Sequence, residues 1–183
     1  MLKAKGARIF SADKKVQSYY HNKKSSIYKK IAQNFKNAVV RGKIDSKRLG
    51  SLVFCDKNKL RKLEDIIHPV IIRDLKKWIR GNRHKAEIYV AEVPLLFEKK
   101  LQRYFDGLIL VYVKKDVLLK RIKKDLNLPK SKALKRLRLF IPDNIKAKNA
   151  DFIIDNSSNI KHLKEEVALL WNKLINRKSL KID

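Results

Sequence analysis

The amino-acid sequence predicts an α/β fold built on a parallel sheet, from two observations. Four short apolar runs resemble buried strands, and three of them are near-continuous in β-branched or large apolar residues, a composition typical of strands covered on both faces. Between them lie long segments with apolar residues at helical spacing, and such alternation favours a parallel sheet flanked by helices. The runs cover residues 7–10, 87–91, 108–113 and 152–154. A chain of 183 residues with an apolar fraction of 44% is expected to form one folded domain.

The helices are expected in the following order. A stripe at every fourth position, running from Ile27 to Val39, predicts the first long helix. Two further stripes cover 60–67 and 70–79, and we interpret His68–Pro69 between them as a helix junction. The whole stretch of about 26–83 is expected to be helical. It is too long for a simple crossover and therefore predicts a helical lobe inserted after the first strand. Stripes at 117–122 and 160–171 predict the last two helices.

Composition narrows the possible partners. The net charge of +28 favours an anionic partner, such as nucleic acid or a phosphorylated metabolite, or reflects only a lysine-rich composition spread over helix faces. No recognisable nucleic-acid motif or aromatic stacking run is present, which disfavours nucleic acid. The lone Cys55 excludes an internal disulfide and a cysteine metal cluster. No apolar run is long enough to span a membrane and no secretory signal is evident, so we expect a cytoplasmic chain without a membrane partner.

Ligands of open α/β sheets bind beyond the carboxyl ends of the strands. Asp13 follows the first run, where it is either a helix N-cap or a general base. Glu92 and Glu98 flank an apolar turn, either as solvated carboxylates or as part of a site. The cation-rich segment 121–148 is either a solvated face or a lid that closes over polyphosphate. His68 has no metal-ligand partner at suitable spacing, which favours a structural role.

Five segments, taken in order, resemble motifs of the dephospho-coenzyme A kinases, a P-loop kinase family. They are GARIFSAD (6–13), GKIDSKRLGSLVF (42–54), LEDIIHPVI (63–71), VPLLFE (93–98) and ADFIIDN (150–156). Any one of them is a weak signal, but five at family spacing, from about residue 6 to residue 171, are specific. The resemblance implies a three-layer P-loop kinase-like parallel sheet with an inserted helical substrate-binding lobe and a helical lid.

The resemblance also implies an activity, which is transfer of the γ-phosphoryl group of ATP, with Mg²⁺, to the 3′-hydroxyl of the dephospho-CoA ribose. Asp13 takes the position of the catalytic aspartate. The lid and ATP positions fall on Arg121, Lys124 and Lys146. Two ranges are implied as well: a CoA-binding lobe at about 26–83 and a lid at about 114–149. The candidates for substrate binding are His68, Pro94, Leu95, Leu96 and Glu98.

The sequence departs from the family in one large respect, because it contains no G-x-x-x-x-G-K-[ST]. Backbone amides of that loop cradle the phosphates and its lysine bridges them. We therefore expect negligible kinase activity and a sheet without its first, central strand. Loss of that strand predicts a marginally stable or aggregation-prone chain. Either an internal methionine taken as the start or gene decay would explain the difference. Smaller departures are Ser11 for aspartate, Ser46 and Lys124 for arginine, and Phe140 for glutamine.

Two other functions stay open on the sequence alone. One is a non-catalytic remnant that binds coenzyme A or a nucleotide. The other, less favoured, is a basic protein that binds nucleic acid.

Overall fold

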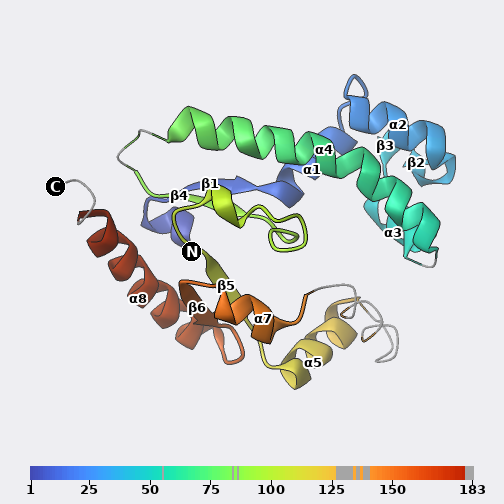
Figure 1. The fold of residues 1–183 in the computed structure, drawn as a ribbon. Coiled ribbons are helices and arrows are strands. Elements are labelled where there is room, and N and C mark those ends of the chain that lie inside the picture. The colour runs from blue at the N-terminus through green and yellow to red at the C-terminus, as the bar shows by residue number, and fades with distance from the viewer. Residues whose placement is uncertain are drawn as a thin grey trace. The chain divides into compact units, whose positions relative to one another are not determined.

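The computed structural model describes residues 1–54, 56–83, 85, 87–126, 134, 137 and 141–179. The chain forms two compact units (Figure 1). One comprises Met1–Arg8 with Leu95–Asp183, and the other comprises Ile9–Pro94. Several residues of the sequence analysis lie outside the described part of the chain: Cys55, Phe140, and five cations of the segment 121–148, which are Lys130, Lys132, Lys135, Arg136 and Arg138.

The unit Ile9–Pro94 contains a pair of strands. β1 (Arg8–Ser11) is hydrogen-bonded to β4 (Tyr89–Glu92), and α1 (Ala12–Tyr20) follows β1 directly. The long helix α4 (Lys57–Asn82) packs against both strands through aromatic rings. The Trp78 ring lies 5.5 Å from that of Phe10 on β1 and 5.6 Å from that of Tyr89 on β4. These contacts fix the strand tips relative to the helix.

The rest of this unit is the predicted lobe, and it is not helical throughout. α2 (Ser26–Asn34) ends at Asn34, five residues before the predicted stripe does, and the short turn η2 (Lys36–Ala38) follows it. β2 (Val39–Val40) then pairs antiparallel with β3 (Lys43–Ile44). Arg41 and Gly42 both have positive φ, 47° and 73°, as a two-residue hairpin turn requires. The helical prediction for Val39 was therefore wrong, because this turn reverses the chain.

The lobe has its own apolar core. The apolar residues of the predicted helical stripe, on α2 and in the turn after it, are buried against α3 (Ser46–Val53) and α4. Asp45 caps α3, accepting a hydrogen bond from the Arg48 amide at 2.9 Å. The buried members are Tyr20, Ile27, Ile31, Phe35, Ala38, Ile44, Leu49, Val53 and Ile66. Residues 20–66 thus fold around a single cluster, as the insertion hypothesis expects of an independent lobe.

α4 runs without interruption through Pro69, so the predicted junction at His68–Pro69 was wrong. A proline inside a helix removes one backbone donor and need not end the helix when packing holds it. Ile66 before the proline and Ile71 and Leu75 after it are all buried, so the helix is packed on both sides of the proline.

The second unit contains β5 (Ile109–Tyr112) and β6 (Phe152–Asp155), which pair in parallel with Ile109 opposite Phe152. α5 (Lys115–Leu126) follows β5, while α7 (Asp143–Lys148) precedes β6 and α8 (Ile160–Ser179) follows it. Ile154 of β6 is buried against Val167 and Leu170 of α8, with Leu2 of the turn η1 (Leu2–Lys5) at the edge of the cluster. A further short turn, η3 (Gln102–Tyr104), precedes β5.

Glycine is required at the end of η1. Gly6 has φ 107°, a backbone conformation that other residues rarely adopt. Its α-carbon faces the Trp171 ring of α8, 3.8 Å from the point where a Cβ would stand. The residue therefore turns the chain into β1 while keeping η1 beside α8.

All four predicted strands exist, each within two residues of its expected bounds. They form the pairs β1–β4 and β5–β6 rather than one continuous ladder. The expectation that these strands are covered on both faces was wrong in part, because Val111 and Ile153 are 58% and 51% exposed. α8 covers Ile154 but leaves these two side chains open to solvent.

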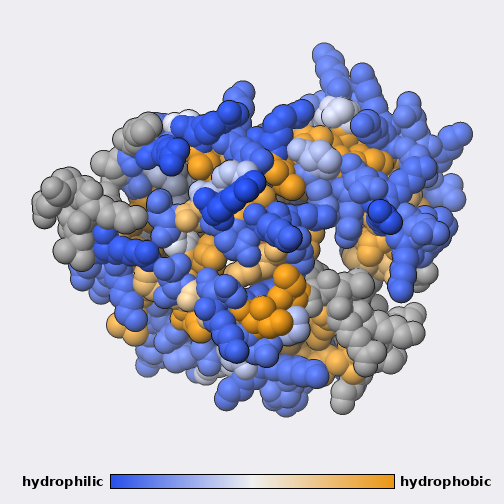
Figure 2. Space-filling view, viewed as in Figure 1, coloured by the Kyte–Doolittle hydropathy of each residue, from blue (hydrophilic) through white to orange (hydrophobic). Residues whose placement is uncertain are grey.

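The visible surface is mostly hydrophilic, with apolar residues in separate patches (Figure 2). This agrees with lysines that are spread over many elements. Among the described residues, no helix combines the length and apolarity that a membrane crossing needs.

Candidate active site

Asp13 lies where β1 passes into α1. Ser11, the last residue of β1, is the N-cap of this helix: its Oγ accepts a hydrogen bond from the Lys14 amide at 3.5 Å. Asp13 is the second residue of the helix and does not cap it. The N-cap interpretation of Asp13 was therefore wrong, and the serine that departs from the family pattern performs that task.

The surroundings of Asp13 make its carboxylate more basic. Burial raises its pKa above the ordinary aspartate value, and the negative charge of Glu92 raises it further. Glu92 is the last residue of β4. Its charge therefore acts from the carboxyl end of one strand on a residue at the carboxyl end of the strand paired with it. Asp13 also acts on Tyr20. Burial and the negative charge of Asp13 raise the pKa of Tyr20 to about 12. A carboxylate at a strand tip with a raised pKa is suited to accept a proton.

The predicted turn after β4 is present. The amides of Lys99 and Leu101 donate to the carbonyls of Leu95 and Leu96 at 3.0 and 2.9 Å, which closes a helical turn. Pro94 is exposed and the leucines are half-buried. Their role as substrate-binding residues stays a prediction.

Glu98 of this turn is bound to two groups that come later in the chain. Its Oε1 accepts a hydrogen bond from the Ile141 amide at 3.1 Å and forms an ion pair with the Lys146 ammonium at 3.2 Å. Burial works to raise the pKa of Glu98. The amides of Glu98 and Ile141 together with Lys146 outweigh burial and hold the pKa below its usual value. The carboxylate is therefore charged, and Lys146 is held by it.

Arg121 and Lys124 lie on α5. The Arg121 guanidinium donates to the Ser158 carbonyl at 3.2 Å, in the turn that follows β6. That turn is joined to the end of β5, because the Lys114 amide donates to Ser157 Oγ at 2.8 Å. Arg121 is thus placed at the carboxyl ends of β5 and β6, where ligands of such sheets bind. Lys124 is exposed one turn further along the helix.

Asp155, the last residue of β6, stiffens the same turn. Its Oδ1 accepts a hydrogen bond from the Ser157 amide at 2.8 Å. Hydrogen bonds from the side chain and amide of Ser157 hold the pKa of Asp155 below its usual value.

His68 is half-buried on α4, and nothing in the described part of the chain gathers three or more His, Cys, Asp or Glu side chains into a metal site. Its predicted roles, structural or substrate-binding, stay predictions.

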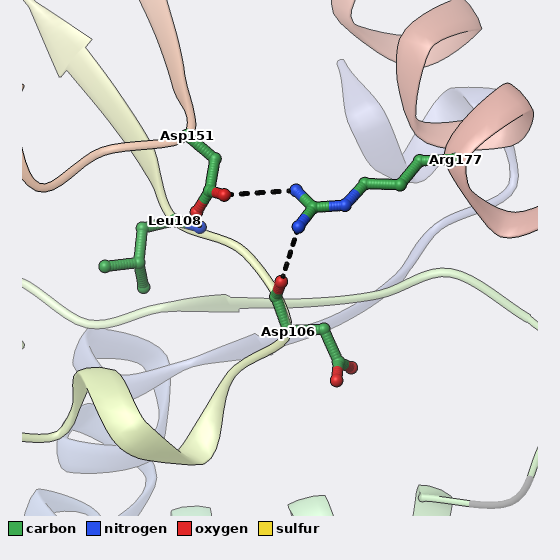
Figure 3. A network of polar contacts seen from close by, with 4 residues as sticks. All are labelled: Asp106, Leu108, Asp151 and Arg177. Carbon is green, nitrogen blue, oxygen red and sulfur yellow. Dashed lines mark hydrogen bonds and ion pairs between the residues drawn. The ribbon is translucent and has the colours of Figure 1, made fainter. Parts of the chain in front are cut away.

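Asp151, in the motif ADFIIDN, lies at the opposite, amino ends of the strands (Figure 3). Its Oδ1 pairs with Arg177 of α8 at 3.2 Å, and its Oδ2 accepts from the Leu108 amide at 2.8 Å. Arg177 also donates to the Asp106 carbonyl at 3.2 Å. This network joins α8 to the starts of β5 and β6, which is a structural reason for an aspartate in this motif.

In each unit the structure brings together residues that the sequence could only name separately. In one unit, the charge of Glu92 acts on Asp13. Glu98 and Lys146 meet in the other. The sequence analysis missed the capping role of Ser11 and the pairing of Glu98 with Lys146. A serine two residues before an aspartate at a strand end was a usable signal for the first. Local spacing could not predict the pairing of Glu98 with Lys146, because the two residues are far apart in the chain.

Comparisons with known proteins agree with this geometry. A family profile described as dephospho-CoA kinase matches residues 1–162. A dephospho-CoA kinase of Aquifex aeolicus is 32% identical over 177 residues, which cover 95% of this chain and 88% of that protein. One from Carboxydothermus hydrogenoformans is 34% identical, over 80% of this chain and 72% of that protein.

Solved structures give the same result for the fold. A crystal structure of a Thermus thermophilus protein matches with a TM-score of 0.67 and 27% identity, over 94% of this chain and 87% of that one. A dephospho-CoA kinase from Campylobacter jejuni matches in fold with a TM-score of 0.61 and 24% identity, over 93% and 86% of the two chains. By its sequence match over most of its length, and by its α/β fold, this chain belongs to the dephospho-CoA kinase family.

Proposed function

We propose that Asp13 is the group that activates the 3′-hydroxyl of the dephospho-CoA ribose for attack on ATP. The observation that carries this role is its raised pKa at the end of β1, where burial and Glu92 act on it. The hydroxyl oxygen forms a bond to the γ-phosphorus while the bond to the ADP oxygen breaks. Asp13 accepts the hydroxyl proton, or orients the hydroxyl for attack.

Arg121, Lys124 and Lys146 are the cations that this proposal assigns to the triphosphate. Charge spreads over the transferred group in the transition state, and cations that face it stabilise that charge. Support comes from the position of Arg121 beside the turn after β6. Mg²⁺ enters as part of the substrate, bound to the phosphates, and supplies neutralisation of their charge.

Binding of the coenzyme is assigned to the lobe of about 26–83, with His68, Pro94, Leu95, Leu96 and Glu98 as the candidate contacts. The helical lid is assigned to about 114–149, and the protein is proposed to act in the cytoplasm.

The printed sequence offers no phosphate-cradling G-x-x-x-x-G-K-[ST]. Since phosphoryl transfer depends on positioning and charge stabilisation, the 183-residue chain alone is expected to turn over far below the roughly 1–100 s⁻¹ of ordinary kinases. Chromatographic detection of coenzyme A formed from dephospho-CoA and ATP with Mg²⁺ tests this. A turnover within that range would refute the expectation.

A second candidate function is binding of dephospho-CoA or a nucleotide without catalysis, and the same missing motif favours it. Saturable binding in the chain together with a complete lack of product would support that alternative.

A further inference from the structure

Glu98 joins two segments that lie far apart in the sequence. It belongs to the turn after β4, whereas Ile141 and Lys146 frame the start of α7. A single carboxylate oxygen holds both, at 3.1 Å from the Ile141 nitrogen and 3.2 Å from the Lys146 ammonium. Glu98 therefore holds the backbone amide of Ile141 and the side chain of Lys146, two groups of the same segment.

α7 has little of its own to hold its beginning. It is six residues long, its N-cap is Pro142, and no side chain of the helix caps it. Short helices depend on outside contacts, because nucleating one is unfavourable. Glu98 supplies such a contact at the Ile141 amide, just before the helix begins.

Lys146 depends on Glu98 in a second way. Only 12% of the lysine side chain and 15% of the glutamate side chain are exposed. An enclosed ammonium group is stabilised by a negative charge beside it. Glu98 Oε1 provides such a charge, at 3.2 Å from the Lys146 ammonium.

We propose that Glu98 is a positioning residue: it anchors the segment just before α7 at Ile141 and keeps the Lys146 side chain aimed for the triphosphate. This inference rests on the proposed function for the role of Lys146. Glu98 then acts on ATP through Lys146 and not through a contact of its own.

The other carboxylate oxygen offers a way to separate the two tasks. Oε2 is buried and meets no hydrogen-bond donor within the described residues. Glu98→Gln can place its amide group at that position and keep its oxygen for Ile141, so it removes the charge alone. Glu98→Ala removes the charge and the acceptor together.

The anchor is tested without any ligand, by amide hydrogen exchange at Ile141. In Glu98→Ala the amide should exchange about tenfold faster or more, whereas Glu98→Gln should retain its protection. Glu165→Gln is the matched control, because this exposed carboxylate pairs only loosely with His162 at 4.0 Å. An unchanged rate in Glu98→Ala would overturn the anchor.

The aiming of Lys146 is tested by calorimetric titration with ATP and Mg²⁺. Glu98→Gln should weaken binding about tenfold, and Lys146→Met by a similar factor. The double variant should bind no more weakly than Lys146→Met alone, because Glu98 acts through the lysine. A glutamate with only a structural role would give additive losses, and that result would overturn the inference.

The two proposals can fail separately. If the unaltered chain does not bind ATP, the aiming of Lys146 for the triphosphate is contradicted, while the exchange rate at Ile141 still decides whether Glu98 is the anchor.

Discussion

At the scale of single residues, the carboxylate of Asp13 is held in an environment that resists its charge. Its pKa is raised by burial and by Glu92. A carboxyl group with a raised folded-state pKa stabilises the protein only at low pH, and that contribution is lost as the pH rises through its folded-state value. Such an arrangement is unfavourable for the fold and useful for a base, which supports the role proposed for Asp13.

This predicts an unusual response to Asp13→Asn. Asp116 is the matched control, since each aspartate is the second residue of its helix and interacts with the helix dipole in the same way. Only Asp13 faces the repulsion of Glu92. At pH 7, urea unfolding should show Asp13→Asn to be more stable than Asp116→Asn by a few tenths of a kcal/mol, because Asp13 is only partly buried and solvent screens the repulsion. The difference should shrink as the pH falls below about 4, where carboxyl groups are protonated.

Tyr20 gives a prediction at the other end of the pH scale. Its pKa is raised to about 12, first by burial and then by Asp13. The stability that it contributes is complete below the ordinary tyrosine value of about 10 and is lost as the pH rises through about 12. Tyr20→Phe keeps the ring in the core and removes this titration. Unfolding at pH 8 and pH 11.5 should therefore show a smaller loss in Tyr20→Phe, by on the order of 1 kcal/mol. Equal losses in both proteins would contradict this reading of Tyr20.

At the scale of elements, the spacing of apolar residues predicted the positions of strands and helices that bury one face. The strands 108–113 and 152–154 and the helices that follow them appear where expected, because apolar spacing reports directly on a buried face. Periodicity failed at Val39, where a turn reverses the chain, and at Pro69, where burial on both sides of the proline outweighed the local pattern. The signal for the hairpin was Arg41–Gly42 between short β-branched runs, which is too brief to outweigh a helical stripe.

A glycine in the hairpin turn and a glycine in α4 should respond in opposite ways when alanine replaces them, as measured by the free energy of unfolding. Gly42 has φ 73°, and a Cβ there would stand 2.6 Å from the Lys23 ammonium, the movable end of a long side chain. Gly81 lies inside α4 with nothing within 4 Å of an added Cβ. Gly42→Ala should lower the free energy of unfolding by about 1 kcal/mol, whereas Gly81→Ala should raise it by about 0.5–1 kcal/mol. Urea unfolding of both variants checks this, and a neutral Gly42→Ala would contradict the assigned turn.

The network at the start of β5 and β6 predicts a graded loss (Figure 3). Asp151→Ala removes the acceptor of the Leu108 amide and the partner of Arg177, and should cost about 1–2 kcal/mol of unfolding free energy. Asp151→Asn keeps an oxygen for Leu108 and should cost less. The Leu108 amide and Arg177 hold the pKa of Asp151 low, so this stability is present above the usual aspartate pKa and is lost as the pH falls through the folded-state value. Equal losses for the two variants in thermal unfolding would show that the Leu108 bond contributes nothing.

The candidate site was predictable from sequence only as a set of separate residues. Asp13, Arg121 and Lys146 could be named because they stand at family motif positions. Their partners could not, because Glu98 meets Lys146 and Arg121 meets Ser158 only through tertiary folding. Local spacing carries no information about contacts between segments so far apart.

At the scale of the whole molecule, family membership and composition point in different directions. The fold and the motifs indicate a kinase that recognises dephospho-CoA, whereas the net charge of +28 would attract any polyanion. Val111 and Ile153 are apolar yet more than half exposed, which agrees with the expected tendency to aggregate. Recognition of the coenzyme should nevertheless be specific, because it depends on a shaped site and not on charge alone.

Calorimetric titration of the chain with dephospho-CoA, beside a single-stranded oligonucleotide at 50 and about 200 mM salt, tests this most directly. We predict saturable binding of one dephospho-CoA per chain that persists at the higher salt, while any oligonucleotide binding weakens steeply. Failure to bind dephospho-CoA, or binding that falls with salt as steeply as that of the oligonucleotide, would contradict the assigned function.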